Sequence, residues 1–192
     1  MELKGNIKNP RTIVIGCFHG DEPQGKFLID EYLKLVDKTE ILFVPCLNTY
    51  GYANNVRTNE HGVDLNRNFP TKNWIKTSKD EFFGGEIPAS EKETQFIINL
   101  VEKYKPKIIL TLHAPFKIVN YDGPYDKIVE EVSKIISYPV ERSVGYPTPG
   151  SFGTWAGIEN QILTITLELD EKIDMIQLEK PVFEIFNLLE GI

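Results

Sequence analysis

The spacing of hydrophobic positions along the chain predicts alternating strands and helices. Four short apolar runs rich in β-branched residues indicate buried strands, at residues 12–18, 40–46, 107–112 and 161–169. A helix between the first two of these runs favours a sheet with parallel members. We therefore expect an α/β fold.

Apolar residues at helical spacing predict four helices. The first follows Pro23 and should turn Phe27, Leu28, Tyr32, Leu35 and Val36 toward the core. The second should begin at a capping box, Ser90 with Glu93, and end before Pro106. The third covers residues 125–136, and the last lies in the tail, with Pro181 near its first turn.

Two connections stand out because they lack periodicity. Residues 47–89 are rich in Gly, Asn, Pro and Thr, and residues 138–153 are rich in Gly and Pro. A connection as long as the first one is more often functional than idle in a compact domain.

Composition indicates one folded domain over residues 1–192, with 41% hydrophobic and 26% charged residues. The net charge of -7, without a Lys or Arg run, argues against a nucleic-acid partner. No apolar stretch has the roughly 18 residues of a membrane span, and the first residues lack the apolar segment of a signal peptide. We therefore expect a cytoplasmic protein with no membrane partner; the sequence gives no sign of its oligomeric state.

Chemically versatile residues gather at the predicted strand ends, where open α/β sheets bind ligands. His19 and Glu22 follow the first strand, and His113 closes the third. Two imidazoles and a carboxylate suit zinc, and three protein ligands leave one position for water. A hydrogen-bonded structural histidine is the competing reading, as is a thiol nucleophile made of Cys17 and His19. His61 lies in a polar loop and is expected to be exposed. Cys17 and Cys46 are expected to be buried and unpaired.

Three further charged residues could belong to a binding site, although surface arginines and a solvent-facing strand-end glutamate are the competing interpretations. Arg57 and Arg67 lie in the long non-helical connection and are two of only four arginines, so they could clamp an anion. Glu168 lies in the last apolar strand. A buried carboxylate there needs a partner, and water on a metal would supply one.

The combination resembles a known family. His19-x-x-Glu22, the run Asp64-Leu65-Asn66-Arg67-Asn68-Phe69-Pro70, His113, the connection from Tyr146 to Trp155, and Glu168 follow the order seen in zinc carboxypeptidases of the carboxypeptidase A type. The resemblance covers residues 11–170. It implies one domain with a central mixed, mostly parallel sheet of about eight strands and helices on both faces.

The resemblance also implies a role for each matching residue. One zinc ion per chain would be held by His19, Glu22 and His113, with Asp64 orienting the first histidine. Glu168 would be the general base and Arg57 would stabilise the oxyanion. Asn66 and Arg67 would grip the free carboxylate of a small peptide substrate, and Tyr146 would close over it.

Two positions depart from the family pattern. Asp21 stands where digestive carboxypeptidases carry an arginine that binds upstream substrate residues. Gly153 stands at the floor of the side-chain pocket, where glycine is expected to leave room for a large or branched polar side chain.

Within the family, residues 62–70 and 143–155 are most similar to murein peptide amidases. This implies a hydrolase that cuts the γ-D-glutamyl–meso-diaminopimelate amide of murein tripeptide, in peptidoglycan recycling. Two alternatives remain open: a zinc deacylase of N-acyl amino acids, such as the aspartoacylase and succinylglutamate desuccinylase type, and a catalytically inactive binding protein on the same scaffold.

Overall fold

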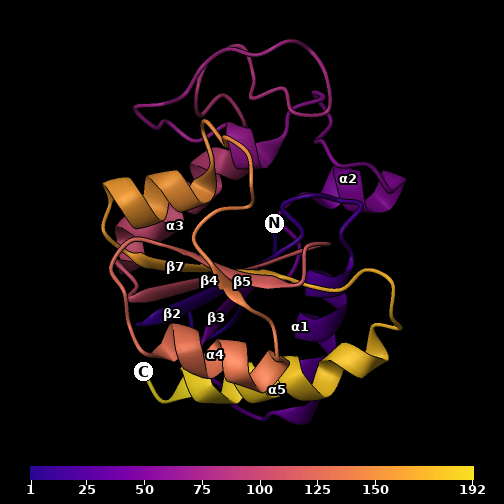
Figure 1. The fold of residues 1–192 in the computed structure, drawn as a ribbon, viewed down its shortest axis with the longest axis vertical. Helices are drawn as coiled ribbons and strands as arrows, with labels where there is room; N and C mark the ends of the chain where they lie inside the picture. Colours follow the sequence, from indigo (N-terminus) through magenta and orange to yellow (C-terminus); the bar gives the residue numbers. More distant parts are fainter.

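The computed structural model describes all residues, 1–192, and is built around one seven-stranded sheet (Figure 1). In spatial order the strands are β1 (Lys4–Gly5), β3 (Leu42–Val44), β2 (Thr12–Gly16), β4 (Ile108–His113), β7 (Leu163–Glu168), β5 (Ile118–Asp122) and β6 (Val140–Glu141). The four central strands, from β3 to β7, are mutually parallel, whereas β1 and β5 run antiparallel to their inner neighbours. The expected mixed, mostly parallel sheet is therefore present, with seven strands.

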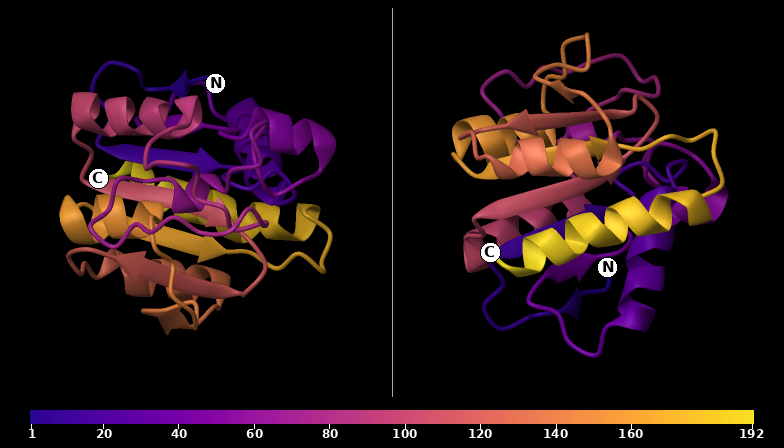
Figure 2. Two further views of the ribbon diagram at one scale, coloured as in Figure 1. Left: turned by 90° about the horizontal axis from the view of Figure 1, so that it is seen from above. Right: turned by 60° about the horizontal axis from the view of Figure 1, so that its bottom comes forward.

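Helices cover both faces of the sheet. The longer ones are α1 (Gln24–Leu35), α3 (Lys92–Tyr104), α4 (Ile128–Ile136) and α5 (Ile176–Glu190); the short elements are α2 (Thr49–Asn54), the 3-10 helix η1 (Leu65–Arg67) and the π-helix η2 (Gly153–Glu159). In Figure 1, α3 and the orange η2 lie above the sheet, and α1, α4 and α5 lie below it. Figure 2 shows the yellow α5 crossing the strands on the lower face.

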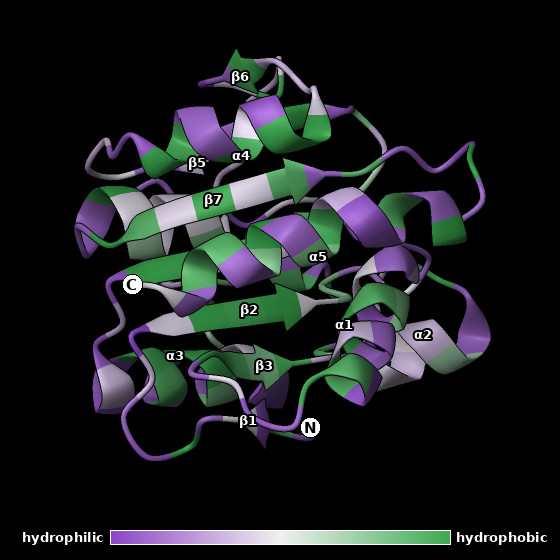
Figure 3. Cartoon of the chain, turned by 90° about the horizontal axis from the view of Figure 1, so that it is seen from below, coloured by the Kyte–Doolittle hydropathy of each residue, from purple (hydrophilic) through white to green (hydrophobic).

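The two faces have separate cores, which the alternation of strand residues specifies. Leu110 and Ile165 point to the face covered by α1, α4 and α5, whereas Ile109 points to the face covered by α3 and η2. Figure 3 shows the amphipathic surfaces of α4 and α5, and it shows β7 alternating between hydrophobic and neutral residues. The neutral residues, Thr164 and Thr166, face the α3 side, where a cavity opens. No helix combines the length and the apolar character needed to cross a bilayer.

Several predicted boundaries were wrong, for local reasons. The Ser90 hydroxyl donates to Glu91 and accepts a hydrogen bond from Asn68, so it does not cap α3, which begins at Lys92. Leu35 ends α1 and is exposed. The Asp174 carboxylate accepts the backbone N–H of Ile176, so α5 begins there and Pro181 lies inside the helix.

Other boundaries moved by a few residues. The strand predicted at 12–18 ends at Gly16 because Cys17 has a positive φ of 51°. The strands predicted at 40–46 and 161–169 shorten to β3 and β7. The helix predicted at 125–136 begins at Ile128, whose backbone N–H is accepted by the Asp126 carboxylate. Strands β1, β5 and β6 were not predicted.

Candidate active site

The turn after β2 carries the first two candidate metal ligands. Cys17 takes a left-handed conformation that ends the strand, and Glu22 lies just before α1. Gly20 packs directly on the backbone of Gly51, because an added Cβ would lie 1.9 Å from the Gly51 carbonyl carbon. Close backbone approach of this kind requires glycine. The turn is thus fixed against α2, with His19 buried at the sheet edge.

The three predicted metal ligands lie together. His19 Nδ1 is 2.7 Å from Glu22 Oε1, and His113 Nδ1 is 2.9 Å from Glu22 Oε2. One ligand atom from each residue lies within 4.8 Å of the other two, so one ion can contact all three. The ligand atoms are imidazole nitrogens and a carboxylate oxygen, a donor set that zinc takes in catalytic sites.

His113 and Glu168 are placed by the sheet itself. They end neighbouring strands β4 and β7 and are register partners. The ring of Phe18 stacks on the His113 imidazole, with centroids 5.4 Å apart and planes at 22°. Strand pairing and this stacking together orient the imidazole toward Glu22.

Asp64 connects the predicted metal site to the long connection. Its Oδ1 lies 3.1 Å from His19 Nε2 and accepts the backbone N–H of Asn66, while its Oδ2 accepts two hydrogen bonds from Arg57. The carboxylate is fully buried. Because it contacts the far nitrogen of the His19 ring, it holds the ring with Nδ1 facing Glu22, as the second carboxylate of a metal site does.

Arg57 points at the same place as the candidate ligands. Its Nη1 lies 3.2 Å from His19 Nδ1 and 3.8 Å from Glu22 Oε1. The exposed ring of Phe82 covers the guanidinium at 5.1 Å and also lies 6.0 Å from that of Arg67. Phe82, which sequence reasoning missed, therefore shields both arginines on their outer side.

Asn66 and Arg67 lie in η1, on the wall of the cavity. The Asn66 side chain accepts the backbone N–H of Phe152, which ties η1 to the segment leading into η2. Arg67 is buried and donates to the Asn66 backbone carbonyl. Its neighbour Arg57 carries the second positive charge of this wall.

These residues line one cavity of about 510 Å³ on the α3 side of the sheet. All nine predicted site residues except Asp64 contribute to its lining. Tyr146 stands at the mouth, half-exposed, with its ring 6.4 Å from that of Phe116. His61 lies elsewhere, mainly exposed, beside Glu91.

The environment of the Glu168 carboxyl shows whether the cavity fits a bound metal ion. Its Oε2 is buried and has no hydrogen-bond partner in the protein. Burial, and then the charge of Glu22, raise the pKa of this carboxyl to about 8. A buried oxygen without a partner is costly, and water held on a nearby cation would satisfy it. The donor set and this unpartnered oxygen both fit a bound metal ion.

The pKa shifts of the three candidate ligands also fit a bound metal ion. Burial opposes charge on His19, but the Glu22 and Asp64 carboxylates raise its pKa to about 9. Burial also opposes charge on Glu22, yet the two imidazoles hold the pKa of its carboxyl well below the usual range. Burial lowers the pKa of His113, with Glu22 opposing. The carboxylates thus attract positive charge to this point, and a metal would replace the proton of His19.

Part of the space beside Gly153 is taken by the Asp122 side chain, a neighbour that the sequence did not predict. A Cβ at this position would lie 2.2 Å from Asp122 Oδ2. Asp122 ends β5, the unpredicted strand, and reaches the cavity wall opposite η2. Its position could not be found from the sequence without that strand.

The fold and this site define a zinc carboxypeptidase: the model of that family matches residues 4–144, and the chain belongs to the family. Murein peptide amidase A of Escherichia coli K12 is 30% identical over 191 residues, covering 92% of this chain and 78% of that protein. The crystal structure of murein-tripeptide amidase from Escherichia coli O157 superimposes with a TM-score of 0.87 at 29% identity, covering 98% of this chain and 85% of that one. Carboxypeptidase A from Helicoverpa armigera shares the fold, with a TM-score of 0.76 at 17% identity over 95% of this chain and 60% of that one.

Membership makes this chain a zinc-dependent hydrolase, and it does not favour the deacylase alternative. Cys17 and Cys46 are both buried and unpaired. The Cys17 thiol contacts the backbone oxygen of Glu22. Its hydrogen bond with the Cys46 thiol, and then burial, raise its pKa, so a thiolate nucleophile is disfavoured.

Proposed function

We propose that this chain hydrolyses the γ-D-glutamyl–meso-diaminopimelate amide of murein tripeptide, during peptidoglycan recycling in the cytoplasm. The observation that carries the proposal is one cavity holding the His19, Glu22 and His113 cluster, the unpartnered Glu168 carboxylate and the buried Arg67. The similarity to murein peptide amidases over most of the chain supports the choice of substrate.

His19, Glu22 and His113 would hold the zinc ion. When bound, zinc supplies a Lewis acid that polarises the amide carbonyl and acidifies water. Asp64 keeps the His19 ring in place through its contact with Nε2.

Glu168 is assigned as the general base. It takes a proton from the attacking water and delivers it to the leaving amine of diaminopimelate. Burial raises the pKa of this carboxyl in the metal-free protein, and a bound cation would favour the ionised form that accepts the proton. Its position opposite His113 in the sheet fixes it beside the metal cluster.

Arg57 and Arg67 bind two different negative charges of the substrate. Arg57, which faces the metal cluster, donates to the oxyanion that develops on the amide oxygen. Arg67, with the Asn66 amide, binds the free carboxylate of the terminal residue and so sets which amide reaches the cluster. Tyr146, at the cavity mouth, closes over the bound peptide.

The test is incubation of the zinc-loaded protein with L-Ala-γ-D-Glu-meso-diaminopimelate, followed by chromatography for free diaminopimelate. N-acetylaspartate and N-succinylglutamate serve as alternative substrates in parallel reactions. Release of diaminopimelate that is lost in the Glu168→Gln variant supports the proposal. Hydrolysis of the N-acyl amino acids alone contradicts it, and zinc binding without any hydrolysis indicates a binding protein.

A further inference from the structure

The cavity continues along the sheet, away from the three candidate metal ligands. Strand register arranges the adjoining sheet in rows: Glu168 lies beside His113 at one end, and Thr164 lies beside Asp122 at the other. Glu168 and Thr164 are four positions apart in β7, which is about 13 Å along an extended strand. Asp122 lines the same cavity as the metal cluster, so its carboxylate is at the far end of the space a substrate side chain would enter.

The π-helix leaves this end open for Asp122. An added Cβ at Gly153 would lie 2.2 Å from Asp122 Oδ2, and one at Gly157 would lie 2.4 Å from its Cβ. The side chain is half-buried and takes part in no hydrogen bond or ion pair within the chain. Burial raises the pKa of Asp122, with Arg142 opposing the shift. This carboxylate is therefore held near the floor of the cavity without a protein cation bonded to it.

Arg142 supplies positive charge to the same part of the cavity. It follows β6, which pairs with β5, and its guanidinium stacks on the Tyr121 ring at 4.3 Å. Arg142 lines the cavity but forms no ion pair with Asp122 or any other carboxylate. The aromatic stacking fixes the guanidinium plane and leaves its N–H groups available.

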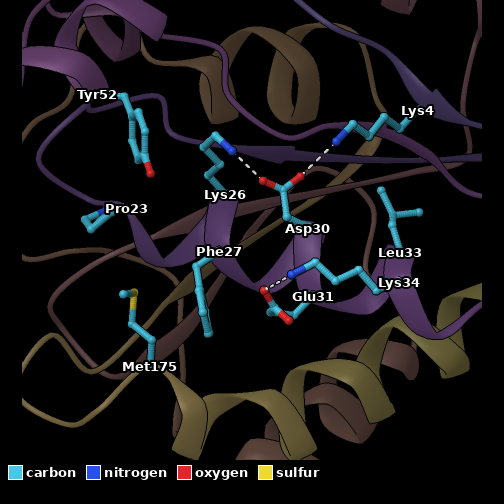
Figure 4. A pocket seen from close by; sticks show the side chains of 10 residues that line it. All are labelled: Lys4, Pro23, Lys26, Phe27, Asp30, Glu31, Leu33, Lys34, Tyr52 and Met175. Atoms are coloured by element: carbon cyan, nitrogen blue, oxygen red, sulfur yellow. Dashed lines mark hydrogen bonds and ion pairs between the residues drawn. The ribbon is translucent and has the colours of Figure 1, made fainter.

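A second cavity offers a comparison, because its charged side chains form ion pairs with one another. On the outer side of α1, a space of about 580 Å³ contains several charged side chains (Figure 4). There, Asp30 bonds both Lys4 and Lys26, and Glu31 bonds Lys34. Its carboxylates already have partners, whereas Asp122 and Arg142 do not.

We infer that Asp122 and Arg142 form a subsite for a zwitterion, the distal amino-acid group of the residue released from the substrate. Asp122 accepts hydrogen bonds from the ammonium, and Arg142 binds the carboxylate. The inference rests on the proposed function, because a diamino diacid such as diaminopimelate carries both groups at the end of a long side chain. A residue bound between the His113 row and the Asp122 row would bring the end of a long side chain closer to Asp122 than the end of a short one.

The experiment uses three tripeptides that differ only in the last residue. One ends in meso-diaminopimelate, one in L-lysine, which lacks the distal carboxylate, and one in L-2-aminopimelate, which lacks the distal ammonium. Values of kcat/KM are measured for the zinc-loaded wild type, for Asp122→Asn and for Arg142→Gln. Glu141→Gln and Arg11→Gln, exposed residues outside the cavity lining, are the matched charge controls.

Each variant should lose activity on the two peptides whose last residue carries the charged group that the replaced side chain binds. Charge-assisted hydrogen bonds of this sort correspond to about 10- to 100-fold in kcat/KM. Asp122→Asn should lose that factor with the diaminopimelate and lysine peptides and little with the aminopimelate peptide. Arg142→Gln should lose it with the diaminopimelate and aminopimelate peptides and little with the lysine peptide. The controls should match the wild type.

Calorimetry with free meso-diaminopimelate separates this inference from the proposed function. Weaker binding by both variants supports the subsite even if the tripeptide is not cleaved, in which case only the choice of bond is wrong. Cleavage of the tripeptide with unchanged selectivity in both variants overturns the subsite and leaves the function intact. A structural role alone would lower the thermal stability of the variants without changing their selectivity, which also overturns it.

Discussion

Replacement of Glu168 with Gln should stabilise the metal-free protein at alkaline pH while it removes activity from the zinc-loaded one. The amide has nearly the same shape as the carboxyl but cannot ionise. Glu168 is 6% exposed, its Oε2 has no partner, and its pKa is raised to about 8. In the unfolded chain the pKa of this group returns to the ordinary value of 4.5.

The sign of the stability effect follows from these two pKa values. Below pH 4.5 the carboxyl is protonated in both states, so the wild type and the variant should be equally stable. Between pH 4.5 and 8 the unfolded chain releases the proton and the folded chain keeps it, so the wild type loses stability as the pH rises. At about 1.4 kcal/mol per pH unit, the difference approaches about 5 kcal/mol at pH 8.

Urea unfolding of metal-free wild type and Glu168→Gln at pH 5 and pH 8 measures this difference. Glu141→Gln, at an exposed glutamate, should change stability at neither pH. With zinc bound the difference should shrink, because a cation favours the ionised carboxylate. Equal stability of the wild type and Glu168→Gln at pH 8, or a more stable wild type, would refute the reasoning. The zinc-loaded variant should lose about 100- to 10,000-fold in kcat.

Four other substitutions address separate parts of the site. His113→Ala should lower the zinc content after dialysis far below one equivalent, measured by atomic emission; a full equivalent would exclude His113 as a ligand. Arg57→Gln should lower kcat about 100- to 1,000-fold with KM little changed, whereas Arg67→Gln should mainly raise KM, and steady-state kinetics with the tripeptide distinguish the two. Gly153→Ala should push the Asp122 carboxylate from its place, because the new Cβ would lie 2.2 Å from Oδ2. It should lower kcat/KM for the tripeptide about 10-fold or more, and unchanged kinetics would contradict that contact.

The central strands could be predicted because their residues are buried on both faces. Runs such as residues 12–16 consist of β-branched and apolar residues, and a short apolar run is a strong signal. Strand β5 has the sequence Ile-Val-Asn-Tyr-Asp, with polar residues facing the cavity, so its pattern is weak. Strands β1 and β6 have two residues each, too few for any periodicity.

The difference between strongly and weakly patterned strands also explains which site residues could be predicted. His19, Glu22, His113 and Glu168 follow or end strands that the pattern predicted, so their meeting at one edge could be anticipated. Asp122 ends a strand that the pattern missed. The π-helix, which brings Gly153 against it, has no sequence signature of its own.

The antiparallel direction of β5 separates two properties of this enzyme. Strands β4 and β7 end at the edge that carries the candidate metal ligands, while β5 starts near that edge and ends at the opposite one. Under the proposed roles, substitutions near the end of β5 would alter which peptide fits and would leave His113 and Glu168 unchanged. Such an arrangement lets related hydrolases differ in substrate specificity while they keep the same reaction.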